Sequence, residues 1–135
     1  MIDPKTIKGA VLGIGCDLVE VDRIRSMHER HGERFIERIY TPVESDYCLA
    51  FKNPYASLAA RFAAKEAVSK AFGTGIGAEL GWLSVSVVKD DAGAPSIVLD
   101  ELGRTLLEKF HGTGVLISLS HTANLAQAYA IVVGD

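Results

Sequence analysis

The chain has 135 residues, of which 48% are hydrophobic and 23% are charged. This length and composition predict one compact domain, residues 1–135, with enough apolar side chains for its own core. The formal net charge of −3 at pH 7 excludes a generally basic surface, so we expect neither a nucleic acid nor an anionic membrane as partner. Any basic binding surface must therefore be local.

The start of the chain and its cysteines point to the same cell compartment. Asp3 and Pro4 stand where a signal peptide would need a basic start followed by an apolar run. Cys16 and Cys48 form neither a metal-ligand spacing nor a disulfide framework. We therefore expect a reduced, cytoplasmic setting.

The first half of the chain predicts one strand followed by helices. Gly13 and Gly15 leave room in the strand for the close approach of another backbone, and Asp17 falls at or just past the strand's end. Thr41 and Glu44 form a capping box that starts the third helix. The predicted elements are a strand at 11–16 and helices at 22–31, 33–40, 42–50 and 54–72.

The second half turns to strands after a glycine-rich segment at 73–81. Asp100 caps the helix expected there, and a turn at 121–124 joins the last two strands. The stretch 110–134 lacks Asp, Glu, Lys and Arg, but polar side chains interrupt it, so a two-stranded hairpin fits better than a membrane span. The predicted elements are strands at 83–89, 95–99, 115–120 and 125–133 and a helix at 101–111.

The order of these elements decides the fold class. In a doubly wound fold, strands and helices alternate to build a parallel sheet. Here helices follow one another in the first half, and strands pair through short turns in the second. We therefore predict an α+β fold, a single compact domain with a mainly antiparallel sheet and packed helices.

The helix at 54–72 carries charged residues although it is apolar on most of its faces, which predicts that it is buried. Arg61 and Lys65 are spaced to form one charged edge. Glu66 and Lys70 are spaced to form another. Surface ion pairs along the helix would explain this spacing but not the burial, because a carboxylate removed from water needs a counter-charge or a metal. We therefore favour a functional site on this helix.

The acids Asp17 and Glu66 are candidate metal ligands from separate elements. By itself, Asp17 after a glycine-rich strand would be interpreted as a turn cap. Two carboxylates are, however, the minimum protein set for a hard cation that completes its coordination with waters and substrate phosphates. The sequence predicts such a site only if the two elements meet.

Two other patterns have ordinary structural explanations. Residues 73–78 match the glycine spacing of dinucleotide sites but follow a helix instead of a strand. Gly73 is explained as a helix C-cap, which leaves the other N–H groups of the segment to cradle a phosphate near Lys70. Ser120 and His121 are neighbours in a strand and point to opposite faces, so they do not form a nucleophile and base, and His121 alone is interpreted as a turn residue.

Three segments together resemble the holo-acyl-carrier-protein synthase family, the short, trimeric class of 4′-phosphopantetheinyl transferases. They are GIGCDLVEVDRI at 13–24, RFAAKEAVSKAFGTG at 61–75 and SLSHT at 118–122, and the match runs in order from about residue 9 to residue 133. The resemblance implies transfer of the 4′-phosphopantetheine arm of coenzyme A to a serine of acyl carrier protein, with release of adenosine 3′,5′-bisphosphate. Charge neutralisation and positioning would supply most of the catalysis.

The same resemblance assigns roles to residues of this chain. Asp17 and Glu66 would bind Mg²⁺ together with the coenzyme A pyrophosphate, which Lys70 would neutralise. Arg61 would contact the 3′-phosphate, and Glu66 is the first candidate for the base or for orienting a water. The implied catalytic set is Glu66, Lys70 and His121, and the implied cofactor-binding set is Arg61, Lys70, Gly73, Thr74, Gly75 and His121.

The resemblance also implies protein partners. A homotrimer would place its active sites at subunit interfaces, with His121 contributed by the neighbouring subunit. Arg23, Met27 and Arg30 match the helix surface that meets the acidic carrier protein, and their i, i+4, i+7 spacing puts them on one face.

The chain departs from the family pattern in two places. Residues 1–9 extend ahead of the usual start without an assignable role, and the strand segment 84–86 has serines where many relatives carry acids. Two alternatives stay open, a metal-dependent nucleotide phosphohydrolase and a non-catalytic trimer that binds coenzyme A. The joint presence of Asp17 and Glu66 argues against the binder, which would not need both acids.

Overall fold

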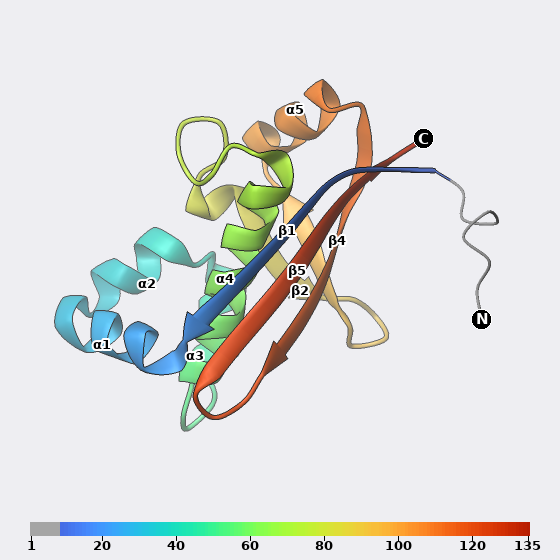
Figure 1. Ribbon diagram of the computed structural model, residues 1–135. Helices are drawn as coiled ribbons and strands as arrows, with labels where there is room; N and C mark the ends of the chain where they lie inside the picture. The colour runs from blue at the N-terminus through green and yellow to red at the C-terminus, as the bar shows by residue number, and fades with distance from the viewer. Residues whose placement is uncertain (1–8) are drawn as a thin grey trace.

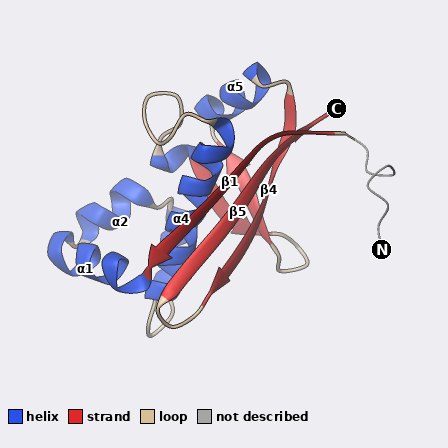
Figure 2. Cartoon of the chain, in the orientation of Figure 1, coloured by secondary structure: helices blue, strands red, loops and turns tan. Residues whose placement is uncertain are grey.

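The computed structural model describes residues 9–135, so the predicted N-terminal extension lies outside the described part except for Gly9. Its strands form two antiparallel sheets, and the helices lie on one side of the three-stranded sheet (Figures 1 and 2). The predicted α+β class is confirmed. The elements are β1 (Ala10–Glu20), α1 (Val21–His31), α2 (Glu33–Ile39), α3 (Pro42–Leu49), α4 (Tyr55–Phe72), the 3₁₀ helix η2 (Trp82–Ser84), β2 (Val85–Lys89), β3 (Pro95–Leu99), α5 (Glu101–Lys109), β4 (Gly112–His121) and β5 (Leu125–Gly134).

The larger sheet has the strand order β1-β5-β4, and β2 pairs with β3 in the smaller one. The charge-free stretch predicted to form a hairpin supplies β4 and β5, which pair along their whole length. No helix within residues 9–135 has both the length and the apolar character needed to cross a bilayer.

Helix α4 lies against one face of the three-stranded sheet, and this close packing depends on glycine (Figure 1). A Cβ atom on Gly13 would lie 1.9 Å from the carbonyl oxygen of Ala71, and one on Gly15 would lie 1.9 Å from that of Ala67. Only hydrogen fits at these two positions, as the glycine-rich strand predicted. This contact sets the distance between α4 and β1. It thereby also sets the relative positions of the side chains that the two elements carry where they cross.

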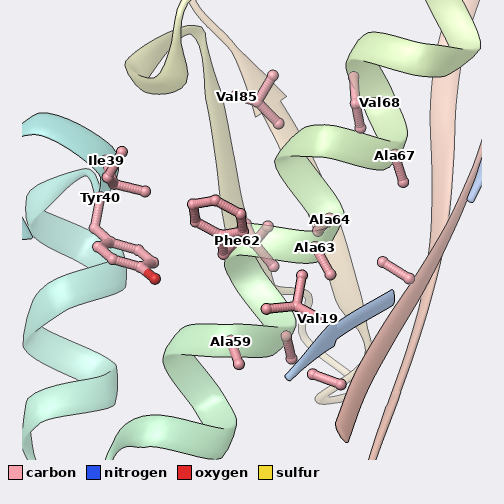
Figure 3. Packing of buried hydrophobic residues seen from close by; sticks show 14 of the residues in the cluster. Val19, Ile39, Tyr40, Ala59, Phe62, Ala63, Ala64, Ala67, Val68 and Val85 are labelled. Carbon is pink, nitrogen blue, oxygen red and sulfur yellow. The ribbon is translucent and has the colours of Figure 1, made fainter. Parts of the chain in front are cut away.

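The core is built largely from small side chains of α4. Figure 3 shows Ala59, Ala63 and Val19 of β1 in one packed region, with Phe62 directed toward Tyr40. These side chains are all at least nine-tenths buried. Small residues from helix and strand let the two backbones approach closely, so α4 is a rigid support instead of a surface helix.

Two boundaries near the predicted site residues differ from the sequence-based prediction. Strand β1 continues to Glu20, so Asp17 lies inside it, opposite Ala128 of β5, and not at its end. The polar residues at the end of β1 concealed the alternation of buried and exposed side chains. This alternation continues to Val19, which is buried. His121 was predicted in a turn but is the last residue of β4, paired with Ala126.

The outer face of the three-stranded sheet, on the side away from α4, is apolar and exposed. Ile14 and Leu18 of β1, Leu116 of β4 and Tyr129 of β5 are between 47% and 68% exposed. They lie in register, since Ile14 and Leu116 both oppose Ile131. A contiguous apolar sheet face of this kind is typical of an interaction surface.

Candidate active site

Asp17, Glu66 and Lys70 are brought together where β1 crosses α4. The ammonium group of Lys70 donates to Asp17 Oδ1 over 2.9 Å and to the carbonyl oxygen of Cys16 over 3.0 Å. Lys70 therefore pairs with the strand acid and not with Glu66 on its own helix. The meeting of the two elements that the metal prediction required is present.

The electrostatics of this group follow from two carboxylates near each other. Burial raises the pKa of Glu66, and the Asp17 carboxylate raises that pKa further, while Lys70 and Arg23 oppose the increase. The hydrogen bond to Asp17 raises the pKa of Lys70. The site therefore favours an additional positive charge between its acids.

The donor set suits Mg²⁺ in its chemistry, because carboxylate and carbonyl oxygens are the ligands this ion prefers. Asp17 and Glu66 are the acids involved, and within residues 9–135 no cluster of three or more His, Cys, Asp or Glu side chains could hold a metal. A hard cation at this place would complete its coordination with water or with oxygens of a bound phosphate.

The glycine segment after α4 caps that helix. Gly73 has φ 74° and Gly75 has φ 67°, both in the left-handed region where glycine is favoured. The N–H groups of Gly73, Thr74 and Gly75 donate to the carbonyl oxygens of Lys70 and Ser69. The C-cap at Gly73 is confirmed, and these three N–H groups are already engaged, so they do not form the suggested phosphate cradle in this arrangement.

Lys65 does not form a charged edge with Arg61, because both are buried. The Lys65 side chain is fully buried, and its ammonium group lies 2.7 Å from the equally buried Glu44 carboxylate. The helix prediction was therefore wrong about this edge. Glu44 was predicted only as a capping residue, but it is also the counter-charge for Lys65.

Arg61 lies apart from the three active-site side chains. Only 7% of it is exposed, its guanidinium lies 4.4 Å from the ring centroid of Tyr47, and Nη1 donates to Ser57. Its Nε is buried without a hydrogen-bond partner among the described residues. Lys89 lies over the same Tyr47 ring, so two cations gather there. The contact between Arg61 and a 3′-phosphate stays a prediction.

Beside Glu66, a groove of about 660 Å³ opens between α1, α2, α4 and η2. Its floor is aromatic: the rings of Phe62 and Trp82 stack with centroids 4.8 Å apart, and the Arg23 guanidinium lies over Phe62. Its lining residues are Arg23, Met27 and His31 from α1, Arg34, Phe35, Arg38 and Ile39 from α2, Phe62 and Glu66 from α4, and Trp82.

The groove includes two of the three predicted carrier-binding residues. Arg23 and Met27 line it, whereas Arg30 is exposed on α1 outside the lining. The sequence analysis missed Arg34 and Arg38, whose i, i+4 spacing on α2 was a usable signal. The groove is thus the local basic surface of an acidic protein.

His121 is not brought to the acids within one chain. It ends β4, and β5 separates that strand from β1 by two strand spacings, or about 10 Å. No hydrogen bond or ion pair in the described part of the chain joins His121 to Asp17, Glu66 or Lys70. If His121 takes part in the same site, it does so from another copy.

Comparison with known proteins agrees with this geometry. The family model described as the 4′-phosphopantetheinyl transferase superfamily matches residues 13–132. The chain belongs to this superfamily. The holo-[acyl-carrier-protein] synthase of Chlamydia trachomatis is 46% identical over 121 residues, which cover 90% of this chain and 98% of the relative. The Desulforudis audaxviator protein of the same description is 47% identical, covering 92% and 94% of the two chains.

Solved structures of the superfamily have the same fold. The synthase from Neisseria meningitidis superposes with a TM-score of 0.85 at 32% identity, covering 91% of this chain and 98% of its own. The Helicobacter pylori synthase, solved in complex with coenzyme A, gives a TM-score of 0.78 at 36% identity and covers 88% and 98%. The resemblance inferred from the three sequence segments is confirmed.

Proposed function

We propose that this protein transfers the 4′-phosphopantetheine group of coenzyme A to a serine hydroxyl of acyl carrier protein. The observation that carries the proposal is the meeting of Asp17, Glu66 and Lys70 at the edge of a basic, aromatic groove. Two acids and a lysine suit a pyrophosphate with its counter-ion, and the groove suits an acidic protein surface. Relatives described as synthases of this kind share 46% identity with the chain, which supports the same activity.

In the reaction, the serine oxygen bonds to the phosphorus that carries the pantetheine arm. The pyrophosphate P–O bond breaks, and adenosine 3′,5′-bisphosphate leaves. The serine proton passes to a base, and Glu66 is the first candidate, either directly or through a water that it orients. Lys70 neutralises the pyrophosphate, and Asp17 with Glu66 would hold Mg²⁺. When bound, this ion would supply further positive charge at the phosphate oxygens.

The groove is the proposed docking surface for the carrier protein. Arg23, Arg34 and Arg38 provide positive charge around an aromatic floor. An acidic helix with one apolar side chain directed inward would meet complementary groups there. Arg30, outside the groove lining, would act at the rim.

We propose further that the active protein is a homotrimer with composite sites. The apolar outer face of the sheet supplies a surface for association, and the separation of His121 from Asp17 within one chain leaves His121 for a neighbour's site. In a ring with heterologous interfaces, each site would combine β1 and α4 of one subunit with the end of β4 of the next.

The activity is tested by incubating the protein with coenzyme A, Mg²⁺ and apo carrier protein and weighing the carrier by mass spectrometry. A mass gain equal to one phosphopantetheine group is expected, and it should disappear with folded Asp17→Ala. Release of bisphosphate without a change in the carrier would select a phosphohydrolase, and binding of coenzyme A without turnover would select a non-catalytic binder. Either result overturns the proposal.

The composite site is tested by mixing. Asp17→Ala and His121→Ala are unfolded and refolded together, so that after random mixing roughly a quarter of all the sites receive both intact residues. Activity should then exceed the sum of the separate variants. If native mass spectrometry shows mixed trimers and no activity returns, the site lies within one chain.

A further inference from the structure

The position of Lys70 points to a role in the chain before any ligand binds. We propose that its ammonium group stands in for the metal ion on Asp17 and that coenzyme A draws it away, so that metal and coenzyme A bind cooperatively. The inference rests on the proposed function and concerns the order in which that site is filled.

The contacts of Lys70 are those that a hard cation would make. Its Nζ lies 2.9 Å from Asp17 Oδ1 and 3.0 Å from the Cys16 carbonyl oxygen. Both acceptors are oxygens on β1, and one of them is a predicted metal ligand. While the ammonium group is there, an arriving metal ion meets a carboxylate that is already neutralised.

The two partners differ in how freely they can move. The Lys70 side chain is 51% exposed and Asp17 is 16% exposed, so the lysine can change rotamer without disturbing the packing. Asp17 is held by the ladder between β1 and β5 and by the close packing of Gly15 against α4. The strand acid is therefore the fixed member and Lys70 the displaceable one.

In the structure, Lys70 supplies the positive charge beside Asp17, one helical turn along α4 from Glu66. A bound pyrophosphate offers Lys70 several anionic oxygens, more than Asp17 alone provides. The ammonium group then leaves Asp17 for the phosphates, and both acids become available to the metal.

This exchange predicts a reciprocal linkage between the two ligands. If coenzyme A tightens metal binding by some factor, the metal tightens coenzyme A binding by the same factor. The metal alone binds weakly, because it must compete with a cation tethered within its own site.

The test measures Mn²⁺ binding, by electron paramagnetic resonance, to the wild type, Lys70→Met and the control Lys109→Met. Lys109 is exposed on α5, so the control removes the same charge without touching Asp17. Without coenzyme A, Lys70→Met should bind Mn²⁺ about five- to tenfold more tightly than the wild type, the effect of removing one nearby positive charge. Lys109→Met should match the wild type. Coenzyme A should tighten Mn²⁺ binding to both proteins by supplying phosphate oxygens, and by a larger factor in the wild type, where it also draws Lys70 away from Asp17.

The outcomes separate this inference from the proposed function. Equal or weaker Mn²⁺ binding by Lys70→Met, checked for folding by circular dichroism, overturns the exchange. If the wild type with coenzyme A still binds Mn²⁺ in that case, and Asp17→Asn does not, the metal site stands without it. If the wild type binds no Mn²⁺ even with coenzyme A, the metal assignment and the exchange both fail.

Discussion

Helix α4 carries two lysines that each pair with a carboxylate from another element, and the two pairs differ in almost every other respect. The Lys65–Glu44 pair is completely buried, at 2.7 Å. The Lys70–Asp17 pair, at 2.9 Å, is partly open to solvent. Since the distances are nearly equal, the surroundings decide what each pair does.

The buried pair has every polar group satisfied. One Glu44 oxygen accepts from the Thr41 N–H over 2.8 Å, and the other accepts from the Val87 N–H over 2.8 Å. The Lys65 ammonium also donates to the carbonyl oxygens of Trp82 and Val85. Burial lowers the pKa of Lys65, and Glu44 opposes this change. The network joins α3, α4 and β2 and leaves no group for a ligand.

The open pair leaves groups available. The Lys70 side chain is half exposed, and the Asp17 carboxylate is close enough to Glu66 to raise the pKa of that acid. In a buried network, a polar group without a partner lowers the stability of the fold. At an accessible site, a ligand can supply the missing partner. The buried, fully paired charges therefore stabilise the fold, whereas the half-paired, accessible charges form a candidate ligand site.

The largest predicted effect comes from breaking the buried pair. Lys65→Met leaves the Glu44 carboxylate buried without its counter-charge and should lower the free energy of unfolding by about 3–5 kcal/mol. Urea denaturation followed by circular dichroism measures it. Lys70→Met is the matched control and should lose less than about 1 kcal/mol, because an exposed ion pair contributes little. Equal losses in the free energy of unfolding of the two variants would show that burial does not distinguish the two ion pairs.

A smaller effect is expected from the support that brings the open pair together. Gly15→Ala places a Cβ 1.9 Å from the Ala67 carbonyl oxygen, so α4 must shift away from β1. We expect a loss of about 1–3 kcal/mol in stability and a larger fall in transfer activity than the stability loss explains.

Gly77→Ala is the control for this variant. Nothing lies within 4 Å of a Cβ at Gly77, so it should keep both stability and activity. Normal activity of Gly15→Ala would show that the spacing of β1 and α4 does not matter to the reaction.

The smallest expected effect comes from removing the charge of Glu66 beside the open Lys70–Asp17 pair. The pKa of Glu66 is raised above its ordinary 4.5, so the folded chain binds this proton more tightly than the unfolded chain does. Stability contributed by Glu66 is therefore lost as the pH rises through the folded pKa. In a metal-free buffer, Glu66→Gln should raise the melting temperature at pH 7 by about 1–3 °C, since solvent screens a half-buried acid.

The gain should shrink as the pH falls through the raised pKa of folded Glu66 and disappear below the ordinary value of 4.5, where Glu66 is protonated in both states. A series of thermal melts from pH 3 to pH 8 measures it. A melting temperature of Glu66→Gln that is unchanged or lowered at pH 7 would contradict the claim that the ionised Glu66 carboxylate destabilises the folded chain.

Local chemistry made much of the fold predictable. The capping pair at Thr41 and Glu44 started a helix where expected, and Gly13 and Gly15 do admit another backbone. These features depend on neighbouring residues or on the backbone itself. The segments that resemble the family also contain Asp17 and Glu66, two acids from separate elements that the fold brings together.

Long-range pairing was not predictable in the same way. Nothing near Lys65 in the sequence indicates that its partner is Glu44, since that contact depends on how α3 packs against α4. The length of β1 was underestimated, because β5, more than a hundred residues later, supplies the hydrogen bonds that extend it past Asp17. The burial of Arg61 likewise follows from Tyr47 on a different helix.

The groove has an optical property of its own. The chain contains one tryptophan, and Trp82 lines the groove against Phe62. Its backbone carbonyl accepts a hydrogen bond from the buried Lys65, which ties the backbone of Trp82 to the core. Tryptophan emission from this protein therefore arises at a single place, and its intensity and wavelength report directly on whatever enters the groove, without an added label.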